Sequence, residues 1–140
     1  MAHPFATASE DAHQLRRVAK AASERAYVPY SRFHVGAALR FPDGDVVTGC
    51  NVENASYGLT ICAERAALVR AIAEGRDTAE IDLIAVHVDG ADGQPCGMCR
   101  QVIAELAPNA MIAFVSGGEY VSCTAEEILP HAFSPGALQA

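Results

Sequence analysis

Apolar residues recur along this chain at two spacings, one typical of helices and the other of strands. From Ser9 to Ala26 they return every three or four positions behind a polar cap, which predicts a first helix. Runs dense in good helix formers predict further helices over 62–73 and 96–106, and a short last helix beginning at Thr124. Runs rich in β-branched and aromatic residues predict strands over 33–41, 46–51, 81–88, 111–115 and 120–123.

Turn residues separate these elements. The sequence Pro-Asp-Gly-Asp at 42–45 joins the first two strands as a hairpin, Gly75 ends one helix and Pro108 ends the next. The resulting order, α-β-β-α-β-α-β-β-α, alternates helices with strands. We therefore expect a single α/β domain over residues 1–140, with three layers, α/β/α, built around a mixed five-stranded sheet.

Composition and charge exclude several classes of protein. Of the 140 residues, 51% are hydrophobic and 19% are charged, as in a compact globular protein. Ten basic residues are scattered among seventeen acidic ones, giving a net charge of −7, which argues against a nucleic-acid partner. No apolar run approaches the roughly 20 residues of a membrane span, and the N-terminus does not resemble a signal peptide. We expect a soluble cytoplasmic protein that does not contact a membrane.

Three cysteines form a pattern that indicates a zinc site. Cys62 lies at the start of one predicted helix, and Cys96 and Cys99, separated by two intervening residues, lie at the start of the next. Thiolates are strong zinc ligands, and three protein ligands leave the fourth tetrahedral position open for a water. Zinc lowers the pKa of such a water to about 7, so this pattern predicts a hydrolytic site with one Zn²⁺ per subunit.

Two charged residues beside Cys62 are candidates for a part in this chemistry. Glu64 is placed to act as the catalytic acid and base, taking the water's proton and returning it to the substrate. Arg65 lies one helical turn from Cys62 and can offset the thiolate charge by hydrogen bonding. Arg100 is a weaker candidate for the same role, with a solvated surface arginine as the alternative.

Other interpretations of the cysteines remain open. Cys96 and Cys99 alone could form a thioredoxin-like redox pair. A closed structural zinc site would need a fourth ligand, for which His87 is available in principle, although it lies within a predicted strand. Cys50 and Cys123 lie outside the pattern, and we expect both to be small buried apolar residues.

The chain as a whole resembles the small homotetrameric cytidine deaminases. Zinc deaminases share a ligand, one intervening residue, a glutamate, and then Pro-Cys-x-x-Cys. Here Cys62 stands at the first ligand, and Asn-Val-Glu-Asn at 51–54 is the narrower signal, which points to a free nucleoside. The resemblance extends from Tyr-Val-Pro-Tyr-Ser-Arg-Phe at 27–33 to Ile-Leu-Pro-His-Ala-Phe at 128–133. Met98 is a departure, since this family often has alanine between the second and third ligands.

The resemblance implies a role for each matching residue. Zinc would be bound by Cys62, Cys96 and Cys99, and Glu64 would move the proton. The substrate-binding residues would be Asn51 and Glu53 for the ribose hydroxyls, Phe33 for the pyrimidine ring, the backbone at Ala63 for the polar edge of the base, and Tyr57 and Phe133 from neighbouring subunits. From the residues alone, Phe33 and Phe133 are as readily explained by packing, and Asn51 and Glu53 by a turn.

The activity implied is hydrolytic deamination of cytidine and 2′-deoxycytidine to uridine and 2′-deoxyuridine with release of ammonia, in pyrimidine salvage. The partners expected are the small nucleoside and three further copies of the chain. Two alternatives remain: a deaminase of another aminopyrimidine such as blasticidin S, and a non-catalytic interaction module stabilised by zinc. The sequence does not decide between ribose and deoxyribose, the tolerance of modified bases, or the effect of Met98.

Overall fold

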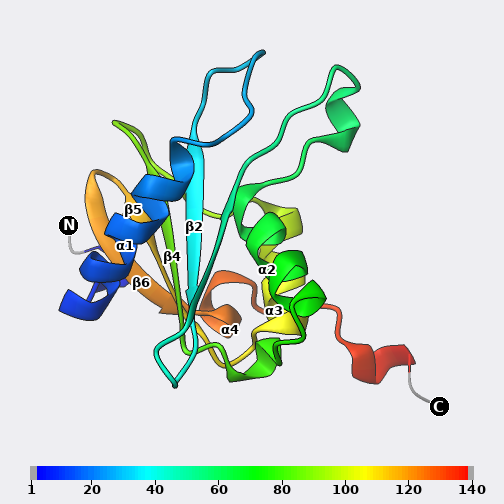
Figure 1. The fold of residues 1–140 in the computed structure, drawn as a ribbon. Coiled ribbons are helices and arrows are strands. Elements are labelled where there is room, and N and C mark those ends of the chain that lie inside the picture. Colours follow the sequence, from blue (N-terminus) through cyan, green and yellow to red (C-terminus); the bar gives the residue numbers. More distant parts are fainter. Residues whose placement is uncertain (1–2, 139–140) are drawn as a thin grey trace.

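A single sheet with helices on both of its faces makes up the fold seen in the computed structural model, which describes residues 3–138 (Figure 1). The strands are β1 (Ala6–Thr7), β2 (Val35–Arg40), β3 (Val46–Cys50), β4 (Leu83–Val88), β5 (Met111–Ser116) and β6 (Glu119–Thr124). The helices are α1 (Glu10–Ser23), α2 (Ala63–Ala73), α3 (Gly97–Leu106) and α4 (Ala125–Ile128), with short 3₁₀ turns at Tyr57–Leu59, Thr78–Glu80 and Pro135–Leu138.

The sheet is mixed, as predicted, but it has six strands in the order β1-β6-β5-β4-β2-β3. Only β4 and β5 pair in parallel; the other neighbours are antiparallel. The expectation of five strands was wrong because β1 has two residues, too few to show the period-two pattern that reveals a strand. Its backbone pairs with the outer edge of β6.

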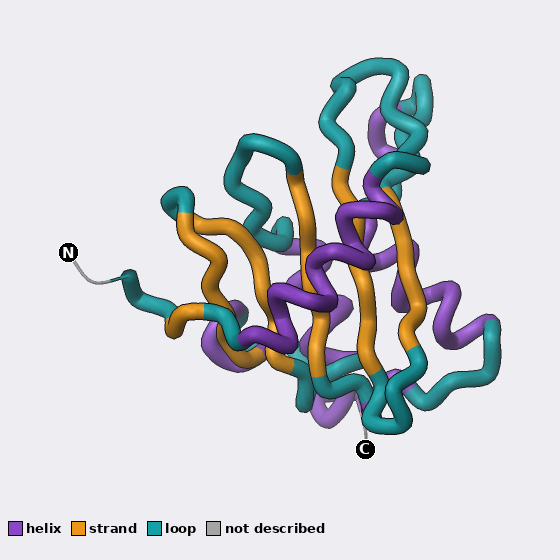
Figure 2. The backbone as a smooth tube through the Cα atoms, turned by 60° about the vertical axis from the view of Figure 1, so that its left-hand side comes forward, coloured by secondary structure: helices purple, strands orange, loops and turns teal. Residues whose placement is uncertain are grey.

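The two faces of the sheet carry side chains of different size. Ala38, Ala85 and Ala113 of the central strands face α1, whereas their larger neighbours face α2, α3 and α4. Small residues allow a helix to lie close to the sheet, and Figure 2 shows α1 crossing this face. The approach is closest at Gly36, where an added Cβ would lie 1.8 Å from the carbonyl oxygen of Ala19. The predicted three layers are confirmed.

The first helix ends three residues earlier than predicted, at Ser23. The chain then turns so that the Tyr27 N–H donates to Asn51 O and the Glu53 N–H donates to Tyr27 O. This pairing requires extended backbone, which competes with the helical pattern of the preceding residues. It holds the segment after α1 beside the segment after β3, and both segments lead into the site.

Helices α2 and α3 begin side by side on the same face of the sheet (Figure 1). Cys62 is the N-cap residue of α2, and Cys96 is the N-cap residue of α3. Gly49 lets α2 lie directly against β3, because a Cβ there would be 2.4 Å from the backbone nitrogen of Ala67. The packing of two helices on one sheet therefore brings together two motifs that are 34 residues apart in sequence.

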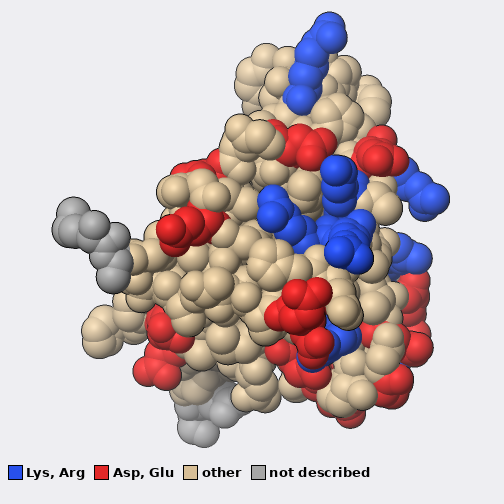
Figure 3. Space-filling model, turned by 90° about the vertical axis from the view of Figure 1, so that its left-hand side faces the viewer, with Lys and Arg blue, Asp and Glu red and all other residues tan. Residues whose placement is uncertain are grey.

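The surface carries both signs of charge. Figure 3 looks onto the face covered by α1, where Lys and Arg side chains gather with Asp and Glu around them. Helix α1 contributes Arg16, Arg17 and Lys20. Within residues 3–138, no helix combines the length and apolar character needed to cross a bilayer.

Candidate metal centre and active site

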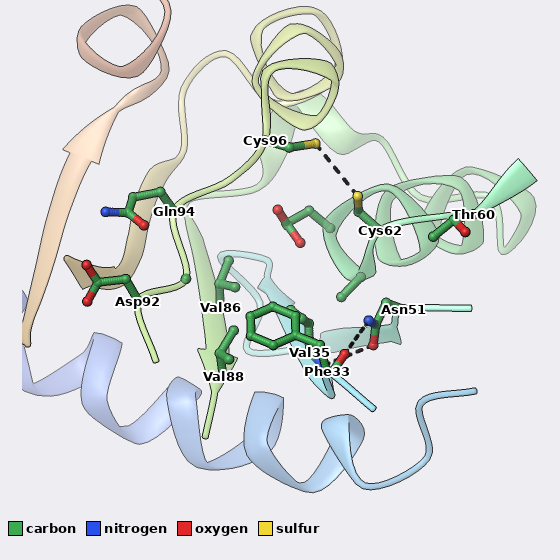
Figure 4. Close-up of a pocket in the computed structure, with 13 residues that line it drawn as sticks. Phe33, Val35, Asn51, Thr60, Cys62, Val86, Val88, Asp92, Gln94 and Cys96 are labelled. Carbon is green, nitrogen blue, oxygen red and sulfur yellow. Dashed lines mark hydrogen bonds between the residues drawn. The ribbon is translucent and has the colours of Figure 1, made fainter. Parts of the chain in front are cut away.

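Three sulfur atoms meet where α2 and α3 begin. The Sγ atoms of Cys62, Cys96 and Cys99 all lie within 4.8 Å of one another. Cys62 Sγ and Cys96 Sγ are 3.7 Å apart, and a dashed line joins them in Figure 4. Tetrahedral zinc with Zn–S bonds of about 2.3 Å separates its sulfur ligands by about 3.8 Å. The donor type and the spacing of the sulfurs therefore both fit one zinc ion.

The protonation of these thiols also favours a cation between them. Hydrogen bonds from the Cys99 thiol and from the Arg65 guanidinium lower the pKa of Cys62 to about 5. The pKa of Cys99 is raised because its thiol donates to Cys62 and because it is buried. The two shifts have opposite directions because two adjacent thiolates would repel each other. A divalent cation relieves this repulsion and allows every ligand to ionise.

No fourth protein ligand joins this cluster among the His, Cys, Asp and Glu residues at 3–138. His87, considered as a fourth ligand, faces α1 instead. Its Nδ1 accepts a hydrogen bond from Arg16 Nε at 3.2 Å, and its Nε2 lies 2.6 Å from Asp89 Oδ1. Three ligands match the open site predicted for catalysis, not the four of a closed structural site.

Glu64 lies in the first turn of α2 and is 4% exposed. Burial, followed by the negative charge of Cys62, raises the pKa of its carboxyl group to about 7. A carboxyl group with a pKa near neutrality can both accept and donate a proton at physiological pH. Glu64 lies two residues after Cys62 and lines the cavity described below, a position compatible with the predicted proton transfer.

The two arginines considered for charge compensation occupy different positions. Arg65 Nη2 donates to Cys62 Sγ at 3.3 Å and lies 3.5 Å from the carbonyl oxygen of Thr60. The contact supports the predicted role of Arg65, which stays a prediction. Arg100 does not contact the sulfurs: its guanidinium donates to Pro95 O at 2.7 Å and to Ile128 O at 3.2 Å. Arg100 therefore joins the loop before Cys96 to the end of α4.

A cavity of about 220 Å³ opens beside the sulfurs and Glu64. Its lining comes from β2, β4, the start of α2 and the segments before β2, after β3 and before α3. The residues are Phe33, Val35, Asn51, Thr60, Cys62, Ala63, Glu64, Val86, Val88, Asp92, Gly93, Gln94 and Cys96. Sequence reasoning placed Phe33, Asn51 and Ala63 at the site but missed Val86 and Val88. Nothing in the pattern of a buried strand reveals which residues at its carboxyl end border a cavity.

Asn51 and Glu53 lie at the end of β3 and hold the segment that carries Phe33. The Asn51 side chain accepts from Val35 N at 2.9 Å and donates to Phe33 O at 2.7 Å. The Glu53 carboxylate accepts from the backbone N–H groups of Tyr30 and Ser31 and from the Ser31 hydroxyl. The Ser31 hydroxyl and these N–H groups lower the pKa of Glu53.

A second cavity, of about 310 Å³, adjoins the first. Glu53, Tyr30 and Tyr57 line it, and Thr60 lines both cavities. The residues expected to bind ribose are therefore divided between the two, with Asn51 in the first and Glu53 in the second.

Besides Glu53, two predicted substrate-binding residues do not line the first cavity. Tyr57 is 76% exposed and borders only the second cavity, and Phe133 is 61% exposed and borders neither. The carbonyl oxygen of Phe133 accepts a hydrogen bond from Gln101 Nε2 on α3 at 2.8 Å. This chain alone thus brings together the metal ligands, Glu64, Phe33, Asn51 and Ala63, and leaves Tyr57 and Phe133 outside.

Cys50, Cys123 and Met98 belong neither to the sulfur cluster nor to the lining of the first cavity. Cys123 is buried, as expected, but Cys50 is only half-buried because β3 forms an edge of the sheet. Met98 is exposed and does not line the cavity. Its difference from alanine therefore changes the outer surface of α3 and leaves the cavity wall unaltered.

Comparison with known proteins identifies the family. Residues 9–115 match the family described as the cytidine and deoxycytidylate deaminase zinc-binding region. The chain is 50% identical over 129 residues to a cytidine deaminase of Halalkalibacterium halodurans, covering 89% of this chain and 95% of that protein. The chain belongs to the cytidine and deoxycytidylate deaminase family. The resemblance inferred from the motifs is confirmed.

Two further similarities support this family assignment. A cytidine deaminase crystal structure from Burkholderia pseudomallei has a TM-score of 0.80 at 49% identity, covering 86% of this chain and 98% of that one. The blasticidin-S deaminase of Bacillus cereus is 31% identical over 108 residues, 71% of this chain and 76% of that protein. As a member of the deaminase family, the chain is a hydrolytic enzyme with a zinc-binding domain, and Cys62, Cys96 and Cys99 form its candidate zinc site.

Proposed function

We propose that this enzyme deaminates cytidine and 2′-deoxycytidine to the corresponding uridines and ammonia. The observation that carries the proposal is the buried Glu64 carboxyl group, with its pKa raised to about 7, in a cavity beside three clustered sulfurs. The cytidine deaminases of similar sequence and fold support the choice of cytidine.

Different residues of the site have different roles in the proposed reaction. Zinc, when bound by the cysteines, supplies a water of lowered pKa. Glu64 takes a proton from the attacking water, transfers it to N3 of the cytosine ring, and then helps to protonate the departing amine as C4 is hydrolysed. Arg65, at 3.3 Å from Cys62 Sγ, offsets part of the thiolate charge. Phe33 and the valines at the ends of β2 and β4 exclude bulk water from the ring.

The ribose would lie where the two cavities adjoin. The amide of Asn51 and the carboxylate of Glu53 are already bonded to the backbone of residues 30–35, which fixes their orientation. Each keeps further hydrogen-bonding capacity, because an amide carries two N–H donors and a carboxylate about four acceptor sites. A substrate without hydroxyl groups at this position would leave this remaining hydrogen-bonding capacity unused, so the arrangement favours a nucleoside over a base without its sugar.

Incubation with cytidine tests this proposal. We expect the ultraviolet spectrum of cytidine to change to that of uridine, and ammonia to appear in equal amount. Blasticidin S is the matched competitor, because a deaminase of that compound is a relative. Equal or faster turnover of blasticidin S, with cytidine unchanged, would assign the enzyme to the second substrate instead.

We also propose that the enzyme is a homotetramer whose neighbouring subunits complete each site. Tyr57 and Phe133 are large aromatic residues that are exposed in the single chain. Other exposed apolar side chains continue along the same loops and along α2, namely Tyr27, Tyr30, Val52, Leu59, Ile61, Val69 and Ile72. Apolar exposure of this kind is typical of surfaces that bury each other on association. The bond from Gln101 fixes the backbone at Phe133 while its ring stays exposed.

Mixed assemblies test whether the sites are shared. We expect Glu64→Gln and Phe133→Ala enzymes each to be impaired when assembled alone. When the two chains are co-expressed, a Phe133→Ala subunit keeps its own Glu64 and receives Phe133 from a Glu64→Gln neighbour, so activity should exceed that of either variant. Activity equal to the mean of the two variants would show that Phe133 does not act across subunits.

The cellular setting proposed is the cytoplasm, with a role in pyrimidine salvage. Three zinc-ligand cysteines and two further free cysteines suit a reducing compartment, where thiols persist. Uridine formed from cytidine would return a salvaged nucleoside to the uracil pool.

A further inference from the structure

One wall of the first cavity is formed by the loop between β4 and α3. Asp92, Gly93 and Gln94 of this loop line the cavity, and the loop leads directly into Cys96. It contains Gly90, at a φ of 66°, as well as Gly93. A loop with two glycines has considerable conformational freedom unless other contacts restrict it. What holds this loop therefore decides the shape of the cavity.

The loop is held by the tip of the β5–β6 hairpin. The Asp92 carboxylate accepts from the backbone N–H of Gly117 at 3.0 Å and from that of Gly118 at 3.2 Å. The Gly93 N–H donates to Val115 O at 2.9 Å. Gln94 Nε2 donates to Ser116 Oγ at 3.1 Å. Three successive loop residues are thus bonded to the same hairpin.

The hairpin tip has the backbone conformation that this contact needs. Gly117 and Gly118 have φ values of 60° and 81°, as in a tight two-residue turn with both central residues left-handed. Two adjacent N–H groups then point to one side, where a carboxylate can accept from both. These bonds lower the pKa of Asp92.

The side chains of Asp92 and Gln94 point away from the cavity. In Figure 4 both extend to the side opposite Cys62 and Phe33, in agreement with their bonds to the hairpin. The cavity is therefore bordered here by the loop backbone, whose position depends on side chains that face outward.

We propose that Asp92 is a positioning residue for substrate binding, which holds the cavity wall in place by binding the two glycine amides of the hairpin tip. It does not take part in the chemistry, because the sulfurs and Glu64 are held by α2 and α3. The inference rests on the proposed function, since its kinetic test uses cytidine.

Replacement of Asp92 by Ala tests the proposal. We expect KM for cytidine to rise about tenfold, corresponding to about 1.4 kcal/mol of lost binding, with kcat changed by less than about twofold. Zinc content should be unchanged. Asp92→Asn keeps one acceptor oxygen and should show a smaller rise in KM for cytidine. Glu119→Ala is the matched control, because it removes an exposed carboxylate from the same hairpin and should behave as the wild type.

Hydrogen exchange gives a readout that does not depend on turnover. In Asp92→Ala, the backbone amides at 93, 117 and 118 should exchange faster, while those of α2 and β4 keep their rates. An unchanged KM with unchanged exchange, or a fall in kcat at constant KM, would overturn the proposal. If the wild type does not act on cytidine, the proposed function fails, and unchanged exchange in the variant would independently reject the contact as a restraint.

Discussion

Replacing Glu64 by Gln should reduce deamination by about 10⁴-fold, the upper end of what general acid–base catalysis contributes. The effect is large because one carboxyl group is proposed to serve every proton transfer of the reaction. Glutamine matches the shape of the side chain, which is 4% exposed, but it cannot accept or return the proton. The measurement is kcat for cytidine, with zinc content determined on the same samples.

The pH dependence of stability, measured on zinc-free protein, gives a second test of the Glu64→Gln variant. In that state the pKa of Glu64 is raised by burial to about 7, from 4.5 for the free group. The folded chain then binds this proton more tightly than the unfolded chain, so this contribution to stability is lost as pH rises towards 7. Stripped Glu64→Gln has no such loss, and should become the more stable of the two between pH 5 and pH 8. If the Glu64→Gln enzyme deaminates cytidine as fast as the wild type, Glu64 has no part in the mechanism.

The second large effect is expected from Cys99→Ala, which should abolish zinc retention and activity together. A ligand present at a free concentration of about 100 times its Kd stabilises a folded protein by about 2.7 kcal/mol. With free zinc held at that level, loss of zinc binding should lower the unfolding free energy by about this amount. A chelator should produce the same loss in the wild type and little further change in the variant. Zinc content, turnover and thermal unfolding measure these effects.

Cys123→Ala is the matched control for the loss of a buried sulfur. Cys99 is 0% exposed and Cys123 is 1% exposed, so both substitutions remove the same atom from the interior. Cys123 lies on β6 and is not part of the zinc cluster. The Cys123→Ala enzyme should keep its zinc and its activity. Equal losses in the two variants would mean that packing, not metal binding, explains the result.

The clustering of the three sulfurs can be predicted from the sequence because most of its geometry is local. A cysteine at each helix N-cap, with Glu64 two residues on and Cys99 one turn on, fixes the direction of each side chain once the helices form. Only the meeting of the two helices requires tertiary structure, and the alternation of strands and helices already indicates it. The same reasoning assigns Arg65 to the sulfurs through its position on α2.

The rest of the site depends on contacts that leave no local pattern. Val86 and Val88 border the cavity because β4 ends there, which the apolar run alone does not show. Arg100, considered for the thiolates, instead contacts two backbone carbonyls, because its side chain points back to the loop before α3. Asp92 is bonded to a hairpin tip 25 residues away, a contact that no spacing rule predicts.

X-ray absorption at the zinc edge of the purified enzyme tests the central claim, that three cysteines hold one zinc ion and leave a position open for solvent. The account predicts three sulfur neighbours at about 2.3 Å and one lighter neighbour, at about 2.0 Å, that is lost or exchanged when an inhibitor binds. Four protein ligands, or fewer than three sulfurs, would contradict it.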